Sequence, residues 1–189
     1  MKHKEILRLH QIASNITGVP ENIILDHSNI VKDISLNIVE NKEIKNIDID
    51  LLIDGALLHD IGAYFCLNKD YSIKIPYIMH GILGEQFLID HKINLKIARF
   101  ASHHTGVGIL KDDIKRLQLP LPMKNFIPET TEEEIVCYAD NFHSKRGTFS
   151  TFDDIKIELE QYGNDKIKRL NEFKKKYGIP MGLEQNSTK

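Results

Sequence analysis

The chain of 189 residues has no tryptophan, only two cysteines and few aromatic side chains of any kind. The two cysteines, Cys66 and Cys137, cannot build a disulfide framework and lack a metal-type spacing, so we expect reduced thiols. No apolar run approaches the roughly 18 residues of a membrane span, and the first residues lack the apolar stretch of a signal peptide. The sequence therefore predicts a cytoplasmic protein without a membrane partner.

The chain also has no large excess of acidic or of basic residues. Twenty-five basic and 27 acidic residues give a formal net charge of −2. Such a balance does not favour nucleic acid as the main partner, because binding to it usually needs a basic surface. A local cluster of Lys and Arg can still hold a small anionic substrate, and the length suits one domain.

Strand-like alternation is scarce, whereas apolar residues recur at helical spacing along most of the chain. Gly18 and Pro20 end the first such segment, Pro76 suits a first helical turn, and Thr131 begins a capping box. We predict an all-α fold, a compact bundle of about seven to nine helices. The predicted helices cover about residues 3–16, 21–41, 48–62, 76–91, 95–104, 112–117, 131–143, 151–162 and 164–177. Residues 120–129, with three prolines, are expected to form a loop.

Residues 151–189 have few large apolar positions and many charges. We expect them to form a C-terminal helical extension packed on residues 1–150, as a lid, a dimer contact or a solvated hairpin. The last residues, 184–189, are predicted to be frayed. The sequence leaves open whether the protein is a homodimer.

The segment IDLLIDGALLHDIGAYF places His59 and Asp60 side by side inside an apolar helix. One buried histidine is usually a satisfied core residue, but an unpaired buried carboxylate costs several kcal/mol. Further histidines and an aspartate fall on apolar faces of other predicted helices: His27, His80, His103, His104 and Asp140. So many such groups in one small core favour a metal site, because divalent ions bind imidazoles and carboxylates and compensate the charge.

Four of these residues form a pattern that resembles the signature of a known family. His27, the doublet His59–Asp60 in LLHDIG and Asp140 in CYAD resemble the H…HD…D signature of the HD-domain metal-dependent phosphohydrolases. The similarity covers about residues 20–147 and implies an all-α, HD-type metal-binding domain over residues 1–150.

His80 in MHGILGEQFL and His104 in SHHTG resemble the two additional ligands of binuclear members of this family. The resemblance implies two divalent ions, with Fe, Mn, Zn, Ni and Mg all open. Of the histidine pair, we favour His104 as the ligand, with His103 as a supporting residue or a substrate contact. The implied metal ligands are His27, His59, Asp60, His80, His104 and Asp140.

Within the family, the pattern is closest to small bacterial hydrolases of symmetric diadenosine polyphosphates. These have a similar HTxG-like turn and an Arg six residues after the last metal Asp, which is Arg146 here. The HH pair is also similar to that of the HD-GYP phosphodiesterases, but the GYP motif is missing. Many relatives continue HDIG with a Lys where this chain has Ala63, so Lys145 and Arg146 are the expected phosphate contacts, with Lys111 and Lys124 as alternatives.

The resulting prediction is a metal-dependent phosphohydrolase that activates water to hydrolyse a nucleotide or a related phosphoester. Asp60 would bridge the ions or orient the nucleophile, and Lys145 or Arg146 would stabilise phosphoryl charge. His103, Lys145 and Arg146 are the expected substrate contacts. The alternatives are a cyclic-nucleotide or dinucleotide phosphodiesterase, a (p)ppGpp-type pyrophosphohydrolase, a di-iron oxygenase and a non-catalytic regulatory HD module.

Overall fold

The computed structural model describes residues 1–182, so the predicted frayed tail, residues 184–189, lies outside the described residues. The helices are α1 (His3–Thr17), α2 (Asn22–Asn41), α3 (Ile49–Leu58), α4 (Ala63–Cys66), the 3₁₀ helix η1 (Tyr77–Met79), α5 (His80–Asp90), α6 (Leu95–His103), α7 (Lys111–Arg116), α8 (Thr131–Asp140), α9 (Phe152–Glu160) and α10 (Asn164–Tyr177). Pairing of extended segments within residues 1–182 is limited to isolated antiparallel bridges, such as that between Ile109 and Phe126. The predicted all-α fold is confirmed.

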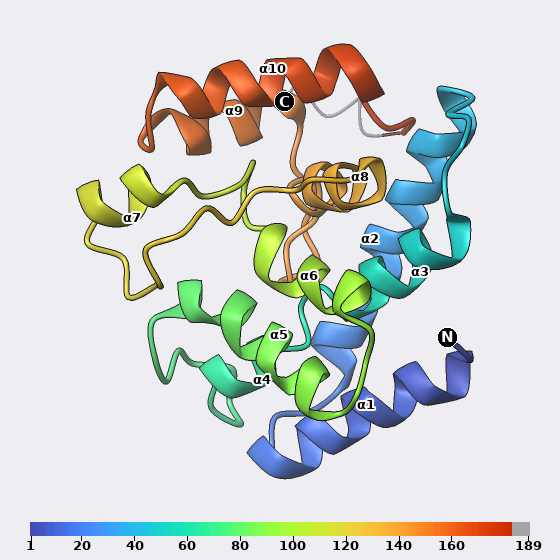
Figure 1. Cartoon of the computed structure of the whole chain (residues 1–189), viewed down its shortest axis with the longest axis vertical. Helices are drawn as coiled ribbons and strands as arrows, with labels where there is room; N and C mark the ends of the chain where they lie inside the picture. Colours follow the sequence, from blue (N-terminus) through green and yellow to red (C-terminus); the bar gives the residue numbers. More distant parts are fainter. Residues whose placement is uncertain (183–189) are drawn as a thin grey trace.

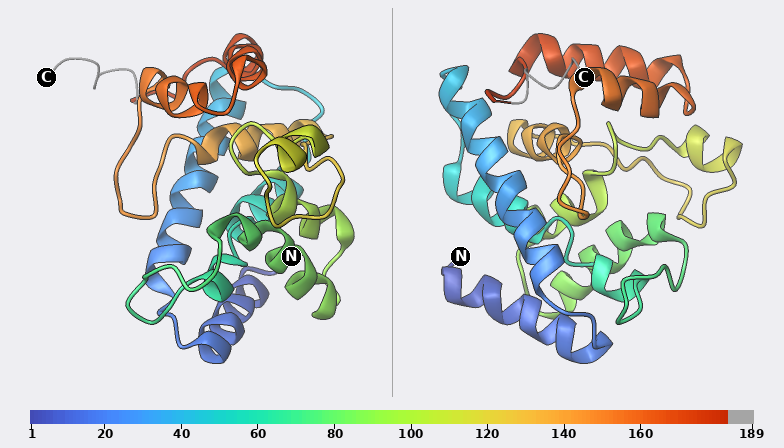
Figure 2. Two further views of the ribbon diagram at one scale, coloured as in Figure 1. Left: turned by 90° about the vertical axis from the view of Figure 1, so that its left-hand side faces the viewer. Right: turned by 180° about the vertical axis from the view of Figure 1, so that it is seen from behind.

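The helices form a bundle with α9 and α10 at one end and α1 at the other (Figure 1). Seen from behind, α2 runs along the molecule between these two ends (Figure 2). α8 lies beneath the α9–α10 pair and also contacts α2 and α3. No helix within residues 1–182 combines the length and the apolar character needed to cross a membrane.

Helix α3 is the centre of the bundle because it contributes to both apolar cores. Leu52 and Ala56 pack with residues of α2, α8 and α10 in one core, whereas Leu57 and Leu58 pack with α1, α4 and α5 in the other. Its Gly55 leaves room for the ring of Phe100 on α6, which a Cβ at this position would overlap. The packing of α3 against several helices therefore fixes the position of the residues that follow it.

The helix that carries the HD doublet ends earlier than predicted. α3 ends at Leu58, and residues 59–62 form tight turns instead of continuing the helix to Gly62. Gly62 lies directly against α5: a Cβ added there would overlap the backbone atoms His80 O and Gly84 N. This contact explains why the turn needs a glycine. Gly84, which also has no side chain, permits the same close approach from its side.

The C-terminal helices are part of the same packing arrangement. Phe152 and Leu159 of α9 and Leu170 and Phe173 of α10 are buried in the core that contains Tyr138 of α8. Burial of these large side chains stabilises the contact of the extension with the bundle. The extension thus shares one core with residues of α2, α3 and α8.

Candidate metal centre

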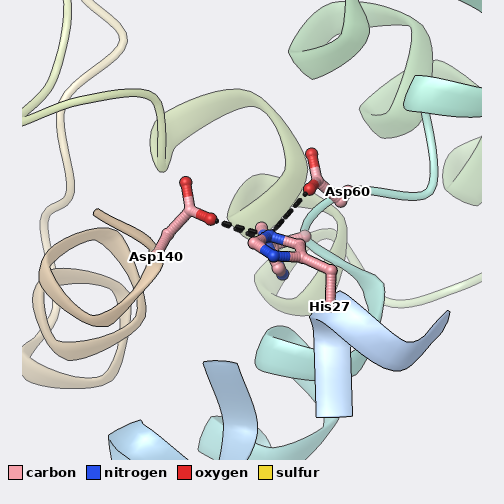
Figure 3. Close-up of side chains that lie close together, drawn as sticks. His27, Asp60 and Asp140 are labelled. Atoms are coloured by element: carbon pink, nitrogen blue, oxygen red, sulfur yellow. Dashed lines mark hydrogen bonds and ion pairs between the residues drawn. The ribbon is translucent and has the colours of Figure 1, made fainter. Parts of the chain in front are cut away.

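Histidines and aspartates, all buried except the partly exposed Asp140, converge at the middle of the bundle, and most of them lie at helix ends. Asp60 lies in the turn after α3, His80 is the first residue of α5, and Asp140 is the last residue of α8. His27 projects from within α2 toward both aspartates (Figure 3). The remaining members, His59 and His104, directly follow α3 and α6.

The first group of potential ligands consists of His27, His59, Asp60 and Asp140. One ligand atom from each lies within 4.8 Å of all the others. Asp140 Oδ1 is 2.9 Å from His27 Nε2 and 3.3 Å from His59 Nε2. The four residues come from α2, the turn after α3 and α8, so only the folded bundle brings them together.

The second group consists of Asp60, His80 and His104, with the same 4.8 Å limit between ligand atoms. His80 Nε2 and His104 Nε2 are 3.0 Å apart. Asp60 Oδ1 lies 3.5 Å from the former and 3.6 Å from the latter, whereas Asp60 Oδ2 lies 3.2 Å from His27 Nε2. The two oxygens of Asp60 therefore face different groups.

The tautomers of three histidines follow from their backbone contacts. Each Nδ1 lies 2.7–2.9 Å from a carbonyl oxygen: His59 from that of Ala56, His80 from that of Tyr77 and His104 from that of Phe100. A carbonyl can only accept, so each Nδ1 carries the hydrogen in the neutral ring. The Nε2 lone pairs then point to the centre.

This arrangement places acceptors against acceptors. In the neutral tautomers, the two Nε2 atoms of His80 and His104 have no hydrogen between them, and Asp60 Oδ1 is buried without a hydrogen-bond partner among residues 1–182. Buried polar atoms of this kind need a compensating group. Imidazole nitrogens and carboxylate oxygens are suitable ligands for divalent transition metals, so these residues fit a metal centre.

The charges inside the centre shift several pKa values. Burial would raise the pKa of Asp60, but the charges of Lys145 and His59 hold it well below its ordinary value. Burial alone would lower the pKa of His59, yet Asp60 and Asp140 raise it to about 10. In the metal-free protein, a proton on His59 can thus partly replace a cation. Burial lowers the pKa of His80 to about 4, which keeps this ring neutral.

The structure brings Lys145 to the centre, where its Nζ contacts Asp60 Oδ2. Arg146, its neighbour, is exposed on the turn between His143 and Phe149, and it does not line the cavity beside the centre. Lys111 and Lys124, the alternative phosphate contacts, are also exposed, and neither lines this cavity.

The two adjacent histidines face different surroundings. His104 belongs to the second ligand group, as the sequence favours. His103 is buried instead, with its Nδ1 3.1 Å from Arg99 O and its ring centroid 5.7 Å from that of Phe126. It is absent from the ligand groups and from the cavity lining, so the structure does not place it as the expected substrate contact.

His143 is the neighbour of the centre that the sequence reasoning missed. Its Nδ1 lies 2.9 Å from Nδ1 of His27, and the two rings stack with centroids 5.2 Å apart. The available signal was its place three residues after Asp140, a spacing that puts both side chains on one side of a helical turn. Tyr77 supports His80 in a similar way, with its ring stacked at 4.7 Å.

A cavity of about 450 Å³ opens beside the centre. Asp140, His143 and Lys145 line one end of it, next to the first ligand group. A ligand held at the centre can therefore extend into this space.

Comparisons with known proteins agree with this site. The model of the HD domain family matches residues 24–145, more than half of the chain. Two tRNA (cytidine(56)-2′-O)-methyltransferases are similar over part of their length. That of Picrophilus torridus is 35% identical over 129 residues, which are 65% of this chain and 33% of the relative. That of Thermoplasma volcanium is 33% identical over 118 residues, 62% and 31% of the two chains.

An uncharacterized protein of Methanocaldococcus jannaschii is 37% identical over 102 residues, 53% of this chain and 54% of the relative. The chain thus spans about a third to a half of the length of these relatives.

Solved structures show the same fold. The HD domain of the L. monocytogenes phosphodiesterase PgpH matches with a TM-score of 0.55 at 16% identity, over 89% of this chain and 87% of that one. The same domain in complex with cyclic-di-AMP matches with a TM-score of 0.50 at 14% identity, over 88% and 92%. These likenesses show the fold, and the match of the HD domain model to residues 24–145 shows the family. The chain belongs to the HD-domain family, within the superfamily of HD-type metal-dependent phosphohydrolases.

Proposed function

We propose that the protein is a phosphohydrolase with a binuclear metal centre, and that it hydrolyses a nucleotide or a related phosphoester. The observation that supports this most directly is the position of Asp60, whose two oxygens face two separate groups of potential ligands. A carboxylate in this position can bridge two ions. His27, His59 and Asp140 would complete one site, and His80 and His104 the other.

When bound, two divalent ions would supply Lewis acidity toward a phosphoryl oxygen and lower the pKa of a water molecule to about 7. The chain's contribution is to hold the ligands in place. Backbone carbonyls fix the rings of His59, His80 and His104, so little reorganisation is needed when the centre is filled.

Lys145 is the cation best placed to bind the substrate's phosphate. Its Nζ contacts Asp60 Oδ2 and lies 5.4 Å from the ring centroid of Tyr77, and Lys145 also lines the cavity. Burial opposes its charge, but Asp60 and other neighbours raise the pKa of Lys145 above its ordinary value, so it stays protonated. A fixed ammonium there would stabilise charge on the phosphoryl oxygens.

The chain offers no competing thiol nucleophile in this region. Burial raises the pKa of Cys66 to about 11, and it also raises the pKa of the buried Cys137 thiol above its usual range. Both cysteines are thus protonated near neutral pH and poor nucleophiles. This favours attack by water.

Direct assays can narrow the range of candidate substrates. The protein should be purified with its metal content measured, and then screened with nucleoside mono- and polyphosphates, diadenosine polyphosphates, (p)ppGpp, cyclic nucleotides and cyclic dinucleotides. The PgpH complex suggests cyclic-di-AMP as one member of the panel. Phosphoester hydrolysis that is lost in Asp60→Ala would support the proposal. Equal activity of Asp60→Ala and the wild type would refute it.

A di-iron oxygenase and a non-catalytic HD module remain the alternatives from other classes. Oxygen consumption with candidate alcohols or phosphonates would identify the former. Metal-loaded protein that is inactive on the whole panel would favour the latter.

A further inference from the structure

The cavity beside the metal centre has two chemically different ends. Asp140, His143 and Lys145 line the end at the centre, and polar Asn141 and Ser144 lie close to them in the chain. The rest of the lining comes from the loop after α6, from α7 and from the C-terminal helices, and it is mostly apolar, with Asp113, Glu158 and Lys166 as its charged members. Its apolar members include Val107, Ile109, Leu117, Leu119, Ile155 and Leu159.

One wall of the cavity belongs to the C-terminal helical pair, here called the α9–α10 hairpin (residues 152–177). Leu159 faces Gly106, two residues after His104: a Cβ on Gly106 would lie 3.7 Å from Leu159 Cδ2. Ile155 and Tyr162 line the cavity on the same side. The hairpin therefore contacts the loop that follows His104, although it lies outside the residues matched by the HD family.

Polar contacts, those of Lys166 buried and those of Arg116 more exposed, attach the hairpin to α7 and to the loop before it. Lys166 of α10 is only 7% exposed, and its Nζ donates to Gly108 O at 3.0 Å and contacts Asp113 of α7. Arg116 donates to Tyr162 O at 2.6 Å and to Asp113 Oδ1 at 2.8 Å. A charged pair held by such additional hydrogen bonds fixes geometry, so the cavity wall is a fixed part of the fold.

A phosphate alone, or a sugar phosphate, would leave these apolar walls in contact with water. A flat heterocycle attached to the phosphate through a sugar would cover them, as ligands do in mostly apolar pockets of about 300–1,000 Å³. We propose that the α9–α10 hairpin determines substrate specificity, with Ile155, Leu159 and Tyr162 forming the surface on which a nucleobase packs while the phosphate lies at Lys145. This inference rests on the proposed function.

The test compares substrates with and without a base in the metal-loaded enzyme. The probes are the four common nucleoside 5′-monophosphates and ribose 5-phosphate, and the variants are Leu159→Ala and Tyr162→Ala. Ile157→Ala is the matched control, because Ile157 also lies on α9 but is 67% exposed and is not part of the cavity. We expect kcat/KM for the preferred nucleotide to fall about tenfold in each cavity variant, mainly through KM, with little change for ribose 5-phosphate.

A second measurement does not depend on catalysis. Saturation-transfer NMR with adenosine, guanosine, cytidine and uridine should show contact of base protons with the wild type and with Ile157→Ala. The signal should weaken in Tyr162→Ala. Because Tyr162 is about half-exposed, this variant should stay folded and can be measured even if the buried Leu159→Ala variant unfolds.

The outcomes separate the two proposals. Equal losses for nucleotides and for ribose 5-phosphate, or no nucleoside contact with the wild type, would overturn the specificity role while leaving phosphoester hydrolysis standing. Nucleoside contact that depends on Tyr162, in an enzyme inactive on every phosphoester, would support the base site and count against the proposed hydrolase.

Discussion

His27 and His143 face each other through their Nδ1 atoms, which lie 2.9 Å apart in rings only 20° from parallel. Since Nε2 of His27 points at Asp60 and Asp140, a metal-binding His27 would carry its hydrogen on Nδ1 and donate it to His143. Nδ1 of His143 must then be the acceptor. Burial lowers the pKa of His143 to about 4, which keeps this ring neutral and able to accept.

Removing this acceptor should weaken metal binding at the first ligand group. We expect His143→Ala to lower metal affinity about 10- to 100-fold, the range known for residues that orient metal ligands. His143→Asn retains an acceptor near the position of Nδ1 and should restore much of the affinity. Isothermal titration of the metal-free variants measures both effects. Equal affinities of the wild type and His143→Ala would contradict this role.

The sharing of Asp60 predicts how metal stoichiometry responds to substitution. We expect His104→Ala to reduce the bound metal from two ions to one, because the group containing Asp140 keeps its ligands. Asp60→Ala should weaken both sites because it removes a ligand from each. Elemental analysis after dialysis counts the ions. Two ions retained in His104→Ala would be incompatible with the proposed second site.

Lys145 and Arg146 are adjacent in sequence but differ in their surroundings. We therefore expect a large loss of activity on replacing Lys145 and almost none on replacing Arg146. Lys145→Met should lower kcat about 100-fold, because it removes a cation positioned for the developing phosphoryl charge. Arg146→Met should have little effect, since Arg146 is exposed and outside the cavity lining. Metal content must be unchanged for the comparison to hold. A larger loss in Arg146→Met would reassign the phosphate contact.

Gly62→Ala should be strongly destabilising, because its Cβ would overlap backbone atoms of α5 rather than a movable side chain. We expect the free energy of unfolding to fall by about 3 kcal/mol, at the upper end for overpacking. The displaced neighbour, His80, should also bind metal more weakly. Gly147→Ala is the control: nothing lies within 4 Å of its Cβ, so only the positive φ costs energy, about 1 kcal/mol. Chemical denaturation of both variants checks the difference.

His10 predicts an acid-sensitive contribution away from the metal centre. Burial lowers its pKa to about 4, while its Nε2 lies 2.9 Å from Leu57 O and its Nδ1 3.1 Å from Tyr64 Oη. Between about pH 6.5 and pH 4, the unfolded chain takes up a proton on this residue and the folded chain does not. The folded state should therefore lose about 3 kcal/mol of stability as the pH falls through this window.

The measurement for His10 is the free energy of unfolding against pH, with chelator present. The slope should be shallower for His10→Gln than for the wild type, since the substituted side chain cannot take up the proton. Parallel curves would show that His10 does not contribute.

The helices were largely predictable because their signals are local. Capping residues such as Asp48 and the apolar periodicity act within a few positions of the helix they define. The predicted cap of α8 was wrong by one residue, because Thr130 and not Thr131 accepts from the backbone N–H of Glu133. The proposed ligands were also accessible, because a histidine or an aspartate is conspicuous in an apolar segment. The early end of α3 was not predictable, since it depends on the contact of Gly62 with a helix about 20 residues later.

The sequence by itself thus determined an all-α chain and the inventory of imidazoles and carboxylates in its core. Only the tertiary structure decided how these groups are used. It directed Asp60 toward two ligand groups, brought His143 to His27, and placed Lys145 at the centre while leaving Arg146 exposed. These relations join residues up to 116 positions apart, and a local pattern carries no information about contacts that arise only when distant helices pack.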